Sequence, residues 1–82
     1  MMFTAEVKVM PLKELLDPQG KAVLDGLKQL GLQHVNDVRI GKHINLQIEA
    51  ATKEEAYTLA EKAAKKLLAN PVMEEYTIQI IP

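Results

Sequence analysis

Apolar and polar residues alternate with a period of two in three stretches of the chain: residues 3–9, 35–49 and 76–80. Such alternation is typical of a strand that buries one face. Pro11 closes the first stretch, because proline has no N–H to donate to a sheet. In the second stretch, Gly41-Lys42-His43 interrupts the alternation, which predicts a hairpin of two strands with the turn at these residues.

Helical spacing of apolar residues marks the segment between the first two stretches. Asp17-Pro18 is a favourable helix start, since the aspartate can accept from free backbone N–H groups and proline fits the first helical position. Gly31 is placed to end the helix in a left-handed cap. Val23, Gly26 and Leu30 share one face. We therefore expect this face to pack on a sheet, with close approach at Gly26.

A second helix follows the predicted hairpin. Thr52 and Glu55 form the pattern of a capping box, in which each side chain accepts from the other's backbone N–H. Asn70 and Pro71 are expected to stop this helix. Its predicted buried stripe consists of Ala56, Leu59, Ala60, Ala63, Leu67 and Leu68.

The predicted order of elements is βαββαβ, which favours one α+β domain over residues 1–82. Right-handed crossovers place both helices on one face of an antiparallel four-stranded sheet, the ferredoxin-like arrangement. A chain of 82 residues has a thin core, and without cysteine it has no disulfide to compensate. We therefore expect association as a dimer or tetramer.

Composition narrows the class of function. The 10 basic residues nearly balance the 11 acidic ones, and both signs are interspersed, which argues against a nucleic-acid partner. No apolar run approaches the length of a membrane span and no signal pattern begins the chain, so we expect a cytoplasmic protein. His34 and His43 lack companions at ligand spacing, so no bound metal is expected.

No set of residues adds up to an active site. An RNA-recognition module would need stacking aromatics on its central strands, and this chain has Asn45 and Gln47 there. Arg39 could serve a small phosphate-handling enzyme, but an ion pair with Asp37 across strands is the simpler interpretation. Catalytic residues, and cofactors bound by the chain itself, are therefore not expected. The chain is interpreted as a non-catalytic partner subunit.

The helix start contains one unexplained residue. Gly20 falls in the first turn, where glycine costs about 1 kcal/mol relative to alanine. A capped helix start explains Asp17 and Pro18 but not this glycine. Glycine is favourable there if another chain or a ligand packs against the backbone. The residues alone leave both interpretations open.

Three segments together resemble the PurS family, the small subunits of phosphoribosylformylglycinamidine synthase: residues 16–22, 35–42 and 66–76. The resemblance implies a structural subunit in purine biosynthesis. Its partners would be a glutaminase subunit, which releases ammonia, and a synthetase subunit, which uses that ammonia, ATP and magnesium to amidate phosphoribosylformylglycinamide. The alternative is an amino-acid-binding regulatory module of the same topology.

The resemblance also suggests which surfaces meet a partner. The helix start and the predicted turn are candidates for contact with another subunit, through Asp17, Pro18, Gln19, Gly20, Arg39, Gly41 and Lys42. The last strand is the candidate for self-association, because Ile81 falls on its polar side and would be buried in an oligomer. The strand residues concerned are Tyr76, Ile78, Ile80 and Ile81.

Overall fold

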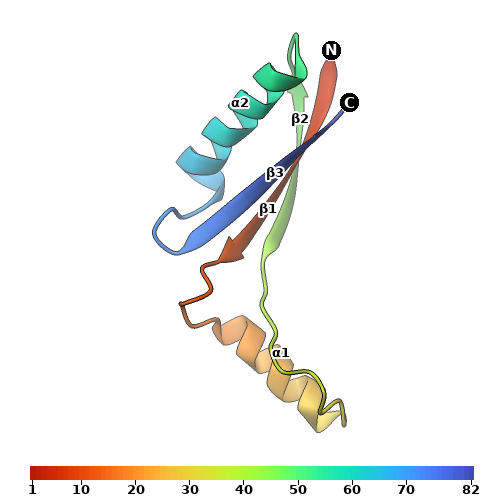
Figure 1. Ribbon diagram of the computed structural model, residues 1–82, viewed down its shortest axis with the longest axis vertical. Helices are drawn as coiled ribbons and strands as arrows, with labels where there is room; N and C mark the ends of the chain where they lie inside the picture. The colour runs from red at the N-terminus through yellow and green to blue at the C-terminus, as the bar shows by residue number, and fades with distance from the viewer.

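The computed structural model describes residues 1–82 as an α+β protein (Figure 1). Its sheet has three antiparallel strands in the order β2-β1-β3. The elements along the chain are β1 (Met2–Pro11), α1 (Pro18–Gln29), β2 (Lys42–Glu49), α2 (Lys53–Ala63), the π-helical turn η1 (Ala64–Leu68) and β3 (Glu74–Ile81). Neither the length nor the hydrophobicity of the helices suits a membrane span.

The strand alternation predicted from the sequence matches the register of the sheet. Val7 of β1 lies between Ile44 of β2 and Ile78 of β3. These side chains face α2, which covers one side of the sheet (Figure 1). The other face carries polar residues, for example Glu6 opposite Asn45.

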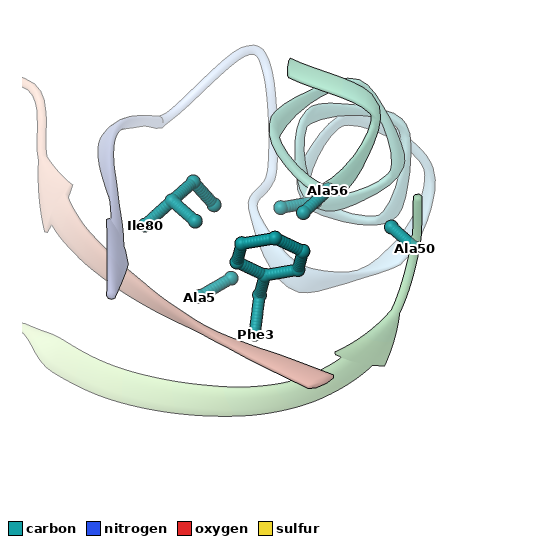
Figure 2. Close-up of a cluster of buried hydrophobic side chains, with 6 residues drawn as sticks. Phe3, Ala5, Ala50, Ala56 and Ile80 are labelled. Carbon is teal, nitrogen blue, oxygen red and sulfur yellow. The ribbon is translucent and has the colours of Figure 1, made fainter. Parts of the chain in front are cut away.

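The core lies between α2 and the sheet and is built largely from small side chains. Figure 2 shows the ring of Phe3 among Ala5, Ala50, Ala56 and Ile80. Ala56, Ala60 and Ala64 are fully buried and lie four residues apart, so they form one stripe along the helix. Alanine at these positions allows the helix backbone to approach the strands closely.

Both ends of the second helix follow the sequence prediction in part. The Thr52 hydroxyl accepts from the Glu55 N–H at 3.1 Å, which is one half of the predicted capping box. The helix widens at its end, where the Ala69 N–H donates to the Ala64 carbonyl five residues earlier. It ends before Asn70, whose side chain accepts from the Val72 N–H at 3.0 Å.

The predicted four-stranded sheet and hairpin are wrong for the single chain. Residues 35–40 form no strand, and residues 41–43 make no turn. The chain instead runs beside α1 and continues directly into β2 (Figure 1). The expected fourth strand therefore does not fold back on β2, and the edge of β2 away from β1 is unpaired.

The first helix also departs from the prediction, because it does not lie on the sheet. We call residues 12–41 the arm; they carry α1 away from the strands (Figure 1). The molecule measures 51 × 25 × 14 Å. Its radius of gyration is 16.2 Å, whereas a compact chain of this length has about 12 Å. The single chain is thus an open structure.

Helix α1 has the predicted caps but an uncovered face. Gly31 has φ +90°, and the N–H of Leu32 donates to the Leu27 carbonyl at 3.1 Å, as in a Schellman motif. Gly26 was expected to approach a sheet, but a Cβ there would meet no atom within 4 Å. Val23 and Leu30, on the same face, are 43% and 77% exposed.

Candidate functional site

The predicted helix start and the predicted turn meet at the base of the arm. Asp17 Oδ1 accepts from the Gly20 N–H at 3.0 Å, and Asp17 Oδ2 accepts from the Ile40 N–H at 2.8 Å. One carboxylate thus caps α1 and ties this helix to the segment that leads into β2. The sequence predicted the cap. The hydrogen bond to Ile40 joins residues 23 positions apart, so no local sequence pattern could predict it.

These contacts favour the ionised form of Asp17. The Gly20 and Ile40 N–H groups lower the pKa of the Asp17 carboxyl below its ordinary value, and the nearby charge of Arg39 lowers it further. Asp17 is therefore a fixed negative charge at neutral pH. Asp17 lies beside the positively charged Arg39, so the base of the arm presents charges of both signs.

Gly20 is explained by a contact within the chain. A Cβ at this position would overlap the Val38 carbonyl oxygen, and it would lie 2.7 Å from Asp17 Oδ2. Gly20 is the buried residue of α1. The absence of a side chain lets α1 lie directly against residues 35–40. Contact of Gly20 with another subunit stays a prediction, but the glycine itself no longer requires it.

Arg39 and its neighbours are held by β1. The Arg39 guanidinium donates to the Pro11 carbonyl, and it forms no ion pair with Asp37, so that expectation was wrong. A Cβ on Gly41 would overlap the Met10 sulfur and the Val9 carbonyl. These contacts hold the predicted turn residues extended across the end of β1.

A groove of about 340 Å³ opens between the start of α1 and the segment before β2. Asp17 and Arg39 line it together with Lys13, Lys21 and Asp37. The sequence pattern did not single out the two lysines. Lys21 lies in the first turn of α1, just after the Asp17 cap, and that position was the available signal; Lys13 lies before the helix and left none.

The remaining partner-contact candidates lie at the borders of this region. Pro18 and Gln19 are exposed in the first turn of α1. Lys42 begins β2, and its Nζ lies 4.0 Å from Glu74 at the start of β3. The structure therefore brings Asp17, Gly20 and Arg39 into direct neighbourhood. It places the other candidates around them.

The self-association candidates occupy a strand with a free edge, because β3 pairs only with β1. Ile80 is buried against Phe3 in the chain's own core, and Tyr76 and Ile78 are half-buried on the same face. Ile81 is 37% exposed and pairs with Thr4, so it lies on the opposite face, as predicted. Of the four, Ile81 is the residue with a side chain free to meet a partner.

Comparison with known proteins gives consistent matches over the whole chain. The family model PurS, described as phosphoribosylformylglycinamidine (FGAM) synthase, matches residues 4–82. The chain is 38% identical over 79 residues to the Bacillus subtilis phosphoribosylformylglycinamidine synthase subunit PurS, covering 96% of this chain and 93% of the relative. It is 36% identical over 78 residues to the Thermotoga maritima subunit, covering 95% of each.

Solved structures agree with the sequence matches. A chain in the structure of PurLQS from Thermotoga maritima superposes with a TM-score of 0.91 at 34% identity, covering 99% of both chains. The structure of Bacillus subtilis PurS gives a TM-score of 0.87 at 36% identity, covering 98% of this chain and 99% of that one. The open three-stranded arrangement is thus shared with these proteins. The chain belongs to the PurS family of phosphoribosylformylglycinamidine synthase subunits.

Proposed function

We propose that this chain is a non-catalytic subunit of phosphoribosylformylglycinamidine synthase, assembled with a synthetase subunit and a glutaminase subunit. The observation that carries this proposal is the end-to-end similarity to PurS subunits, including a chain in the PurLQS structure. The amino-acid-binding regulatory module is not favoured, because the matches with known proteins agree on a synthase subunit.

The chain's contribution to the reaction is positional. The glutaminase subunit releases ammonia, and the synthetase subunit uses it with ATP and magnesium to amidate phosphoribosylformylglycinamide. A bridging subunit that fixes the two sites relative to each other allows ammonia to pass between them. The partner subunits carry out all of these steps. We expect the complex to lie in the cytoplasm.

The base of the arm is the proposed contact with a partner subunit. Its groove presents Asp17 and Asp37 beside Lys13, Lys21 and Arg39. Asp17 and Arg39 are each held by backbone groups of the chain, so both charges are in place before a partner arrives. Charges of both signs in fixed positions favour one partner and one orientation over others.

Reconstitution tests the function. Glutamine-dependent turnover is expected when the synthetase, the glutaminase and this chain are mixed, and it is expected to fall at least tenfold when the chain is left out. Ammonia supplied directly is expected to support turnover by the synthetase without the chain. Equal glutamine-dependent turnover with and without the chain would overturn the proposal.

A charge reversal tests the proposed contact. Lys21→Glu changes the groove while leaving α1 favourable, because an acidic residue near a helix N-terminus suits the helix dipole. We expect weaker binding to the other subunits with an unchanged circular dichroism spectrum. Lys62→Glu, an exposed residue of α2, is the matched control. Equal binding of the two variants would place the partner contact elsewhere on the chain.

A further inference from the structure

The edge of the sheet formed by β3 is open along its whole length. β3 pairs with β1 from Glu74 to Ile81 and has no strand on its other side. About half of its backbone N–H and C=O groups therefore point outward without a partner strand. One more strand can extend the sheet at this edge.

β3 lacks the features that protect free edges in many proteins. Such edges usually carry lysine, an interior proline or a bulge, and each of these hinders pairing with another chain. Residues 76–81 contain no charge and no proline, and their register with β1 continues without a bulge. Their β-branched and aromatic side chains give them a high propensity for strand pairing. The edge thus favours an added strand over exposure to water.

A groove of about 480 Å³ runs beside this edge, between β3 and the first half of α2. Its lining consists of Lys53, Glu54, Tyr57, Ile78, Gln79 and Ile80. Ile80 is buried in the core below, whereas Tyr57 is 42% exposed. A strand added to β3 directs every second side chain to the α2 side of the sheet, which is the side of this groove.

The other end of β3 carries an unpaired negative charge. Glu74 is held within the chain, since it accepts from the Asn70 N–H at 2.8 Å and lies 4.0 Å from Lys42 Nζ. Glu75 is exposed on the polar face of the sheet and forms no ion pair. Lys8 shares this face but stands opposite Thr77. Glu75 is therefore free to pair with a basic side chain on an added strand.

We infer that the edge of β3 binds an extended segment of a partner subunit, which joins the sheet as a strand. One side chain of the segment is apolar and enters the groove beside Tyr57, opposite Ile78 or Ile80. Another is a lysine or arginine opposite Glu75. The two positions are three or five residues apart, so they fall on opposite faces of the added strand, as the groove and Glu75 require. The choice of a synthetase or glutaminase subunit as the partner rests on the proposed function.

A second copy of β3 fits this edge less well. Residues 74–81 contain two glutamates and no basic residue, so another copy brings no positive charge to Glu75. A twofold antiparallel pairing centred on Ile78 places Glu75 opposite Ile81 of the other copy. Centring the pairing on Thr77 places Glu75 opposite Gln79. The charges thus favour a foreign segment over the self-association that the sequence suggests for this strand.

The position of the edge suits a subunit that joins two others. The groove beside β3 lies near Ala5, which pairs with Ile80, whereas the base of the arm lies at Pro11, which pairs with Glu74. Six residues of extended strand separate Ala5 from Pro11 by about 20 Å. The two grooves share no lining residue, so two partner subunits can occupy them at the same time.

Hydrogen exchange of the backbone amides tests the added strand. The chain is measured alone and in the complex with the synthetase and glutaminase subunits, by mass spectrometry of peptides that cover residues 53–63 and 74–82. We expect about half of the β3 amides to exchange about tenfold more slowly in the complex, because they gain hydrogen bonds. The amides of α2 are already bonded within the helix, and their exchange is expected to change by less than about twofold.

Either of two exchange results would overturn the β3 contact. The first is unchanged exchange of β3 in the complex. The second is slow exchange of β3 that appears in the chain alone as its concentration is raised, because a second copy would then occupy the edge. The measurement uses the unaltered chain, so it does not depend on the folding of a variant.

Two pairs of variants test the side chains. Glu75→Lys reverses the free charge, and Glu49→Lys makes the same change at an exposed residue of β2 on the same face of the sheet. Tyr57→Ala removes one wall of the groove, and Tyr57→Phe keeps it. In titrations of the other subunits, we expect Glu75→Lys and Tyr57→Ala to bind about tenfold more weakly, and the two controls to bind within about twofold of the unaltered chain.

The binding results separate this contact from the proposed function. If the unaltered chain and all four variants bind the other subunits equally, the β3 contact is wrong and the proposed function stands. If the unaltered chain binds neither subunit, both are wrong. Weaker binding by Glu75→Lys and Tyr57→Ala alone, together with slower exchange of β3, supports both.

Discussion

The valine at the centre of the sheet provides the sharpest test of the core. Val7 lies on β1 between both neighbouring strands, and it is fully buried with Val9, Ala64 and Ala69 around it. Val7→Ala removes two carbons from a place where the rigid sheet and the alanine stripe of α2 cannot close in. The substitution therefore leaves a cavity.

The expected cost follows from the burial. Two buried carbons contribute about 1.6 kcal/mol in transfer free energy, and the cavity raises the loss to about 2–3 kcal/mol. A domain of 82 residues has a free energy of unfolding of about 4–12 kcal/mol. The variant is thus expected to fold, with a melting midpoint lower by about 8–24 °C.

Thermal unfolding followed by circular dichroism measures this effect, at one fixed protein concentration because association shifts the midpoint. Val72→Ala is the matched control, since Val72 is 77% exposed and the same two carbons are removed. The control is expected to change the free energy of unfolding by less than about 0.5 kcal/mol. If both variants melt at the same temperature, Val7 is not packed as described here.

Two further predictions concern the arm. Asp17→Asn is expected to lower the melting midpoint at pH 7, because the hydrogen bonds that Asp17 accepts lower its pKa in the fold. The contribution of Asp17 is present above the ordinary aspartate pKa of about 3.9 and is lost as the pH falls through the lower folded value, so the difference between the two proteins is expected to narrow as the pH is lowered below about 4. A difference that stays constant as the pH falls would contradict this. Gly26→Leu is expected to raise the melting midpoint at a fixed, low protein concentration, because leucine favours a helix over glycine by about 1 kcal/mol and a Cβ at Gly26 would meet no atom within 4 Å; a lower midpoint would show that this face is packed.

The elements of the fold were largely predictable from local patterns. Period-two alternation located β1 and β3, and the caps at Asp17 and Thr52 located both helix starts. The π-helical turn Ala64–Leu68 was not predictable, because its alanines, lysines and leucines suit an ordinary α-helix equally well. The widened bond runs from the Ala69 N–H to the Ala64 carbonyl, and no local sequence pattern distinguishes it from an ordinary helical bond.

The hairpin was wrong for a physical reason. Alternation shows that residues 35–40 suit a strand, but it carries no information about whether they fold back on the strand that follows them. The decisive contacts are tertiary: Gly41 fits against Met10, and Asp17 accepts from the Ile40 N–H. Neither is visible in the local sequence, since residues distant along the chain make both.

Contact of the candidate site with a partner stays a prediction. The sequence pattern singles out Asp17, Gly20 and Arg39, and these residues lie close together in the structure. Their contacts within the chain are structural: Gly20 makes room for the Val38 carbonyl, and Arg39 binds the Pro11 carbonyl. An unusual residue in a sequence marks a tightly constrained place, whether the constraint comes from the chain itself or from a partner.

The polar ties at the base of the arm have a consequence for the thermodynamics of assembly. A flexible tether would lose conformational entropy when it docks, and that loss would subtract from the affinity. Here the Asp17–Ile40 and Arg39–Pro11 hydrogen bonds order the arm during folding of the single chain. The arm is preorganised, so its conformational entropy is lost during folding, before two molecules encounter each other. Loosening these ties would weaken association without removing a single intermolecular contact.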